Sequence, residues 1–300
     1  MTHRLLQRDI LKGVLRYSLL LLCAAAWAQD TRVILLGTGT PNPEPQRMGP
    51  AVAVVSGEHV YLVDCGPGVV RRAAEAGLQM EQLTRVFVTH LHSDHTAGYP
   101  DLILTPPNSG RVEPLEAYGP PGLRAMTAHV MAAWKEDLDI RLHGTQPVVP
   151  RGFMVEAHDV KPGQVYRDPG MRIVAFAVDH GGWKHAYGYR FEAPDKTVVI
   201  SGDTTYSKTL IAAAKGCDIL VHEVYSEKGL ANRTPDWQRY HSAYHTSGPD
   251  VGRVAAEVKP KKLVLYHLLP MGQTREELLD EVRRHFDGEI VYGNDLDVIR

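Results

Sequence analysis

Four residues of the kinds that bind metals, spaced within six positions, constrain this chain more than any other feature of its sequence. His90, His92, Asp94 and His95 come directly after an apolar run, Val86 to Val88. Such a run indicates a buried strand, and a strand that ends in a short loop can direct several side chains at one point. With 15 histidines and 35 acidic residues in 300 positions, chance would produce this spacing roughly 0.004 times in such a chain. The pattern therefore predicts a metal site.

The number of ligands in this loop favours more than one metal ion. Histidines that lie two apart at a strand end can point the same way. A zinc ion is usually tetrahedral and seldom takes every ligand from one segment. Because Asp94 and His95 add to the two histidines before them, two adjacent ions are the simpler expectation.

Later segments offer candidates for the remaining ligands. His180 follows a predicted strand, with His185 as its competitor. Asp203 comes directly after a predicted hairpin, 187–200, and a hairpin brings its outer ends together, so Asp203 and His180 should meet. Asp203 could instead cap the helix predicted at 207–215.

The stretch THLHSDHTAG, from Thr89 to Gly98, resembles the signature of the metallo-β-lactamase-fold hydrolases. The resemblance runs from about Thr31 to the C-terminus. It implies an α/β fold, a four-layer αββα sandwich with a two-metal site on one edge. In related sequences a histidine precedes a GYR-like strand at this distance, so the resemblance favours His180 over His185.

The resemblance also implies a ligand set for two Zn²⁺ ions per chain, with Mn²⁺ or Fe as alternatives. The first ion would be held by His90, His92, His180 and Asp203. The second would be held by Asp94, His95, His267 and the bridging Asp203. Asp64 matches the first motif of the family and would hold the histidine loop by hydrogen bonds, or else cap the helix that begins near Val69.

Two further segments resemble one branch of this family. His222-Glu223, and His245 just before a predicted helix, are similar to the branch that contains ribonuclease Z and the arylsulfatase-like and cyclic-phosphodiesterase-like enzymes. There a histidine matching His245 donates a proton or stabilises the transition state, aligned by an acid matching Glu223. We therefore expect His245, Glu223 and Asp94 to act in catalysis. His245 could instead lie in a helix-capping region without a role, and His241 could be the functional histidine.

The N-terminus has the pattern of an export signal. A basic start and a Leu- and Ala-rich run precede Ala26-Trp27-Ala28, a small-x-small cleavage site. We predict a signal peptide, 1–28, and a hydrolase domain, 29–300, in the periplasm or outside the cell. The run is short for a membrane span, so no stable span is expected after cleavage, and an uncleaved anchor is the alternative. Cys65 and Cys217 could pair or remain free thiols.

Together these features predict an exported dinuclear zinc hydrolase that cleaves a small phosphodiester or an aryl sulfate ester with hydroxide generated at the metals. The net charge of −2 gives no electrostatic reason to expect a nucleic-acid partner, and no long Gly/Pro/basic insertion between His95 and His180 is available to grip tRNA. The alternatives are a ribonuclease Z-like endoribonuclease for tRNA 3′ processing, a lactone or other carbonyl-ester hydrolase, and a non-catalytic metal-binding protein. The expected partner is a small-molecule ester, and related enzymes commonly form homodimers.

Overall fold

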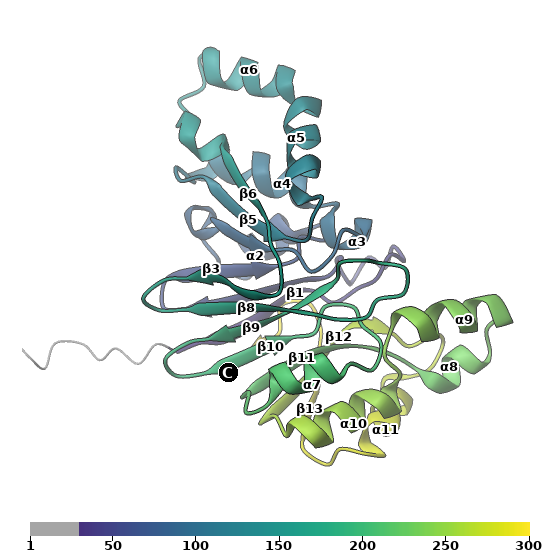
Figure 1. Cartoon of the computed structure of the whole chain (residues 1–300). Helices are drawn as coiled ribbons and strands as arrows, with labels where there is room; N and C mark the ends of the chain where they lie inside the picture. The colour runs from purple at the N-terminus through teal and green to yellow at the C-terminus, as the bar shows by residue number, and fades with distance from the viewer. Residues whose placement is uncertain (1–29) are drawn as a thin grey trace, which may run out of the picture.

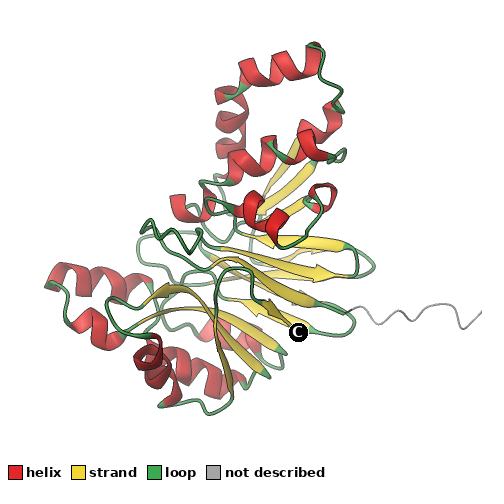
Figure 2. Ribbon diagram, turned by 180° about the vertical axis from the view of Figure 1, so that it is seen from behind, coloured by secondary structure: helices red, strands yellow, loops and turns green. Residues whose placement is uncertain are grey.

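The computed structural model describes residues 30–300, and the predicted signal peptide lies outside them. Two seven-stranded sheets pack face to face, and helices cover their outer faces (Figure 1, Figure 2). The αββα sandwich expected from the resemblance is therefore confirmed. Within the described residues, no helix combines the length and the apolar character needed to cross a membrane.

Each sheet combines antiparallel and parallel strands. In hydrogen-bonded order, the first sheet contains β14 (Val298–Ile299), β1 (Arg32–Gly37), β2 (Ala51–Ser56), β3 (His59–Val63), β4 (Arg85–Phe87), β5 (Leu115–Gly119) and β6 (Val155–Asp159). The second contains β13 (Glu289–Tyr292), β12 (Lys262–Leu269), β11 (Ile219–Tyr225), β10 (Thr197–Ile200), β9 (Tyr187–Glu192), β8 (Arg172–Ala177) and β7 (Gly163–Arg167). Strands β3 to β6 are parallel to one another, and so are β10 to β13. Their carboxyl ends therefore meet at shared edges.

The strands bury both faces, which produces three apolar layers. In β1, Val33 faces the other sheet, whereas Ile34 faces the helices. In β12, Val264 joins the same layer between the sheets, whereas Leu265 faces the helices on the opposite side. Successive side chains of a strand point to opposite faces, so a strand covered on both sides must be apolar throughout. This is why β1, β2, β11 and β12 are nearly continuous apolar runs.

The helices form the two outer layers and two extensions. The first sheet is covered by α2 (Val69–Glu75), α4 (Tyr99–Leu104) and α5 (Leu123–Ala133). The second is covered by α7 (Lys208–Ala214), α10 (Gly248–Val258) and α11 (Arg275–Arg283). In Figure 1, α6 (Lys135–His143) extends from the end of α5, and α8 (Glu227–Ala231) and α9 (Pro235–Tyr244) extend from the second sheet. The remaining short helices are α3 (Ser93–Thr96), η1 (Met80–Gln82), η2 (Pro106–Ser109) and η3 (Pro150–Phe153).

The two cysteines lie in different layers. Cys65 and Cys217 are both buried and free. Cys65 belongs to the apolar layer between the first sheet and its helices, and Cys217 to the layer between the second sheet and its helices. A disulfide between them is therefore excluded, and the free-thiol alternative is correct.

Arg111 is a buried cation that backbone carbonyl groups hold in place. It is only 1% exposed. Its guanidinium donates to the carbonyl oxygens of Leu83 at 3.0 Å, Leu102 at 2.8 Å, Ile103 at 2.9 Å and Gly152 at 3.1 Å. Burial lowers the pKa of Arg111 to about 10, so the side chain stays charged near neutral pH. This one side chain therefore ties α4 to η3 and to the residue that ends η1.

We predict that Arg111→Leu lowers the free energy of unfolding by at least about 3 kcal/mol, because several buried carbonyl groups lose their donor. Urea denaturation followed by circular dichroism measures the loss. The control is Arg151→Leu, which removes an exposed arginine paired with the exposed Glu113 and should cost less than about 1 kcal/mol. Equal losses in the two variants would contradict this role of Arg111.

Candidate metal centre

The predicted ligands meet at the edge of the sandwich where strands of both sheets end. His90 comes three residues after β4, Asp203 comes three residues after β10, and His267 lies near the end of β12. The histidine motif continues from β4 into α3, so Asp94 and His95 lie on the first turn of that short helix. The carboxyl ends of strands are where α/β folds commonly assemble a site, because loops from several strands converge there.

His90, His92 and His180 form one cluster with Asp203. Nδ1 of His92 lies 2.9 Å from Nε2 of His90 and 3.1 Å from Nε2 of His180. Oδ2 of Asp203 lies 3.9 Å from Nε2 of both His90 and His180. One donor atom from each residue falls within 4.8 Å of the others, so a single cation can reach all of them.

Asp94, His95 and His267 form a second cluster beside the first. Oδ2 of Asp94 lies 3.6 Å from Nε2 of His95 and 3.3 Å from Nε2 of His267. Oδ2 of Asp203 lies 3.4 Å from both of these nitrogens. Asp203 therefore stands between the clusters, where a carboxylate can serve two cations. Helix α7 is capped by Ser207, so the helix-cap alternative for Asp203 is wrong.

His267 reaches the cluster through a bulge in β12. Along the pair of β11 and β12, Glu223 is opposite Tyr266 and Val224 is opposite Leu268, which leaves His267 as an extra residue. Its φ is +44°, in the left-handed region that residues other than glycine seldom adopt. A bulge of this kind redirects a side chain, and here it turns the imidazole toward Asp94.

Hydrogen bonds on the outer ring nitrogens orient the first cluster. Nδ1 of His90 lies 3.0 Å from Oγ1 of Thr89, and Nδ1 of His180 lies 2.7 Å from the carbonyl oxygen of Tyr244. Both rings therefore present Nε2 to the cluster, as metal-binding histidines commonly do. His185, the competitor of His180, belongs to none of the ligand groups in the described part of the chain.

The ring of His92 has the opposite orientation. The indole N–H of Trp183 donates to Nε2 of His92 at 2.9 Å, so Nδ1 faces the cluster. A neutral imidazole carries one N–H. A cation at Nδ1 would therefore place the ring proton on Nε2, and the contact with Trp183 would have to change when the cation binds.

Asp64 holds the histidine loop, as one of the two alternatives predicted. Its Oδ1 accepts the backbone N–H of Thr89 at 2.7 Å. Its Oδ2 accepts the Thr89 hydroxyl at 2.9 Å and lies 2.7 Å from Nδ1 of His95. Gly68 occupies the N-cap position of α2. The hydrogen-bonding role of Asp64 is therefore confirmed, and its helix-cap alternative is wrong.

The charges of the site suit a divalent cation. Burial acts to raise the pKa of Asp203, but the imidazoles around it, His267 and His95 first, hold that pKa well below its usual value. Burial acts to lower the pKa of His95, but Asp203 and Asp64 outweigh it and keep that pKa well above its usual value. Among the described residues, Nε2 of His95 and Oδ1 of Asp203 are buried without a hydrogen-bond partner. These unused nitrogen and oxygen donors fit the predicted zinc ions.

His245 and Glu223 lie directly beside the clusters. Nδ1 of His245 is 3.4 Å from Oε2 of Glu223 and 3.8 Å from Oδ2 of Asp203. Burial lowers the pKa of His245 to about 4, whereas burial and the charge of Asp203 raise the pKa of Glu223 well above its usual value. His245 is the C-cap residue of α9 and lies two residues before Ser247, which caps α10. His245 also forms a third group of potential ligands with Asp203 and His267.

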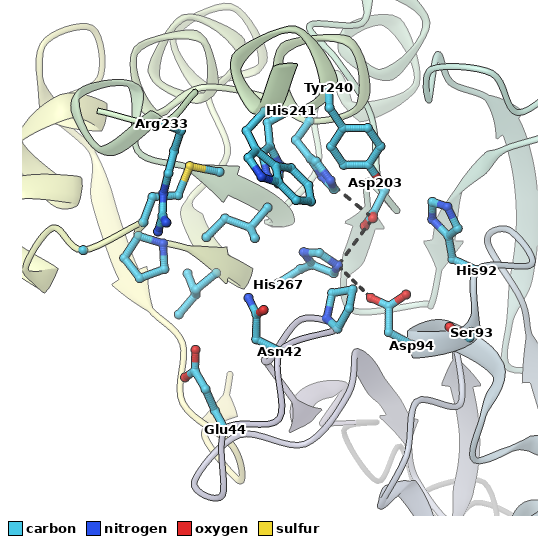
Figure 3. A pocket seen from close by; sticks show the side chains of 18 of the residues that line it. Asn42, Glu44, His92, Ser93, Asp94, Asp203, Arg233, Tyr240, His241 and His267 are labelled. Carbon is cyan, nitrogen blue, oxygen red and sulfur yellow. Dashed lines mark hydrogen bonds and ion pairs between the residues drawn. The ribbon is translucent and has the colours of Figure 1, made fainter. Parts of the chain in front are cut away.

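A pocket of about 870 Å³ opens over the clusters. Figure 3 shows Asp203 and His267 at its inner end, with His241 on one wall and Glu44 on the other. The pocket exposes the clusters to a ligand from outside while Asp203 and His267 stay buried at its base.

Helix α9 forms a wall of this pocket that the sequence analysis did not predict. Trp237, Tyr240, His241 and Tyr244 follow the i, i+3, i+4 and i+7 spacing of one helix face, a signal from which the helix could have been inferred. The ring centre of His241 lies 5.6 Å from that of His245. His241 lines the pocket, but it joins none of the ligand groups found in residues 30–300.

Comparison with known proteins identifies relatives of the chain. Residues 59–268 match the family described as the Beta-lactamase superfamily domain. The chain is 36% identical over 241 residues to a ribonuclease Z from Mycobacterium sp. (strain KMS). This alignment covers 79% of the chain and 84% of that ribonuclease Z. The chain is also 34% identical over 272 residues to a ribonuclease Z from Mycobacterium bovis (strain BCG / Pasteur 1173P2). That alignment covers 88% of the chain and 96% of the relative.

Solved structures with the same fold include two that span nearly the whole described chain. The metallo-beta-lactamase fold protein YhfI from Bacillus subtilis aligns with a TM-score of 0.68 and 22% identity, over 89% of this chain and 98% of that one. The short form of human tRNase Z aligns with a TM-score of 0.68 and 22% identity, over 90% of this chain and 98% of that one. At 22% identity, these two alignments show that the folds are alike and nothing finer.

We predict that Asp64→Asn weakens zinc binding about 10- to 100-fold, because His95 loses the carboxylate that orients it. Asparagine tolerates the left-handed backbone at this position, where φ is +60°. Competition with a chromophoric chelator measures the affinity, and circular dichroism checks the fold. Asp168→Asn is the control, since that carboxylate also accepts hydrogen bonds, from Tyr61 and Tyr166, but belongs to no ligand group. Zinc affinity equal to that of the unsubstituted chain would rule out the role of Asp64.

Proposed function

Because the chain belongs to the β-lactamase superfamily, in its ribonuclease Z branch, we propose that it is a metal-dependent phosphodiesterase of the ribonuclease Z type. The observation that carries this proposal is the pairing of His245 with Glu223 beside two clusters of potential metal ligands. The relatives named ribonuclease Z favour this alternative over the sequence-based first choice of a small phosphodiester or aryl sulfate, because a ribonuclease cleaves phosphodiesters. They lend no support to a sulfate ester.

The chain binds a divalent metal, as its family and its histidine and aspartate clusters indicate, and we propose two zinc sites. The first would use His90, His92, His180 and Asp203. The second would use Asp94, His95, His267 and the shared Asp203. Metal ions held there would act as Lewis acids on the phosphoryl oxygens and would make water a better nucleophile.

The protein groups would divide the remaining work of hydrolysis. Water adds to phosphorus, the bond from phosphorus to the leaving oxygen breaks, and that oxygen takes a proton. Asp94 lines the pocket beside the second cluster and would accept a hydrogen bond from the attacking water. His245 would donate a hydrogen bond or the proton to the leaving oxygen. Glu223, buried behind it, would position that imidazole through Nδ1.

We propose that the scissile diester is a small molecule or the end of a chain. Among the described residues that line the pocket, Arg233 is the only lysine or arginine, and it is accompanied by the acidic Glu44 and Asp236. A long RNA backbone needs a basic track, which this entrance does not offer. Export, predicted from residues 1–28, would also separate the enzyme from tRNA precursors.

Parallel assays of the purified full chain test the proposed function. The substrates are bis(p-nitrophenyl) phosphate, p-nitrophenyl sulfate and a tRNA with a 3′ extension, each with zinc and with chelator. We expect chelator-sensitive cleavage of the phosphate diester. Faster cleavage of the sulfate would overturn the proposal, and zinc binding without any turnover would favour the non-catalytic alternative.

Asp203→Ala should abolish turnover, because both clusters share this carboxylate. A fully active, metal-loaded variant would argue against the mechanism.

We predict that His245→Ala lowers kcat by about 100-fold or more for a diester with an alkoxide leaving group. The loss should be smaller for a p-nitrophenyl ester, whose leaving group departs without a proton. Zinc content is measured in parallel, because His245 lies close to Asp203 and His267.

The control variant is His241→Ala, which removes a second histidine that lines the pocket beside His245. A large loss in that variant, with His245→Ala unaffected, would transfer the role to His241. Equal losses of His245→Ala on both leaving groups, with zinc retained, would exclude proton donation.

A further inference from the structure

Helix α9 presents aromatic rings to the pocket instead of to the core. None of its residues is buried, and Trp237 is 54% exposed and Tyr240 38% exposed. Trp237, Tyr240 and His241 all line the pocket, and we call these three side chains the aromatic face. Large aromatic side chains that stay exposed beside a catalytic site commonly mark a ligand-binding surface.

The aromatic face is continuous with the metal centre. The ring of Tyr244 lies 5.1 Å from that of His180, centre to centre. It stacks on Tyr240 at 4.4 Å with an angle of 24° between the planes. Trp237 meets Tyr240 edge to face, with the ring centres 5.7 Å apart. A row of aromatic rings therefore leads from His180, in the first cluster, outward to Trp237.

Charged groups stand around the outer part of the pocket. Figure 3 shows Arg233 on the same side as His241, and Glu44 on the opposite wall. Asp236 is paired with Arg239, whereas neither Arg233 nor Glu44 takes part in an ion pair within residues 30–300. These two side chains are therefore available to hydrogen-bond the edge of a ligand.

We propose that the aromatic face binds the nucleobase of a nucleoside phosphodiester whose scissile phosphate lies at the metal clusters. This inference rests on the proposed phosphodiesterase activity. A nucleobase offers π faces that stack on tryptophan and tyrosine, and polar edges that can pair with Glu44 and Arg233. A plain hydrocarbon ring would cover these charged groups without satisfying them, which is unfavourable. The pocket volume of about 870 Å³ is within the usual range for ligands larger than a simple phosphate.

The decisive measurement compares two diesters with the same leaving group. One is the p-nitrophenyl ester of thymidine 5′-monophosphate, and the other is methyl p-nitrophenyl phosphate, which has no base. We expect Trp237→Ala to lower the ratio of kcat/KM for the nucleoside ester over the methyl ester by about tenfold. Trp237→Phe keeps a ring and should retain most of the ratio. Trp134→Ala, at an exposed tryptophan outside this pocket, should leave the ratio unchanged.

Calorimetric binding of thymidine 5′-monophosphate to the zinc-loaded chain gives a readout that does not depend on turnover. We expect Trp237→Ala to weaken this binding by a similar factor and to leave the binding of methyl phosphate unaltered. Equal loss on both diesters, or no loss on either, overturns the inference even though the phosphodiesterase is active. If the unsubstituted chain cleaves neither diester, the proposed function fails, and the nucleotide binding alone then decides whether the aromatic face recognises a base.

Discussion

The buried carboxylate of Asp203 is the interaction on which the site and its surroundings depend. Its Oδ2 lies 3.4 Å from imidazole nitrogens of His95 and His267 and 3.9 Å from those of His90 and His180. An ionised carboxylate is costly to bury unless opposite charges and hydrogen bonds compensate it. Here the compensation comes from three separate segments of the chain, which meet only because strands of both sheets end at one edge. The same carboxylate lies within reach of both clusters, so whatever removes it disturbs the whole centre.

Two backbone positions are held in an unusual conformation to complete this arrangement. Asp64 and His267 both have positive φ values, +60° and +44°, and such positions cost on the order of 1–3 kcal/mol each. At Asp64 this cost is offset by buried hydrogen bonds to Thr89 and His95. At His267 it is offset by the paired strands on either side of the bulge. The sandwich therefore supplies rigidity that the site converts into fixed side-chain directions.

Different parts of the pocket are assigned different tasks in our proposal. The clusters and the pair of His245 with Glu223 would carry out the hydrolysis. Glu223 and His267 lie in strands of the second sheet, and His245 lies between α9 and α10. The wall formed by α9 lies outside the core and contains no buried residue. Its side chains can therefore vary without loss of the fold, which makes this wall suited to substrate choice. In this proposal the pocket would join a buried reactive end, at Asp203, to an exposed recognition surface, at Trp237.

The sequence by itself determined the features that depend on short spacing. The histidine motif predicted a metal site because its ligands share one loop, and a local hairpin predicted that His180 and Asp203 would meet, as they do at 3.9 Å. The wider layer order of the fold came from the resemblance. Only the tertiary structure decided the contacts between distant segments, such as Asp94 with His267, 173 residues apart. The tertiary structure also decided that Asp64 binds the histidine loop and does not cap a helix. It placed α9 at the wall of the pocket, and it showed that a bulge directs His267. These depend on strand register and on packing between the sheets, which local periodicity does not encode.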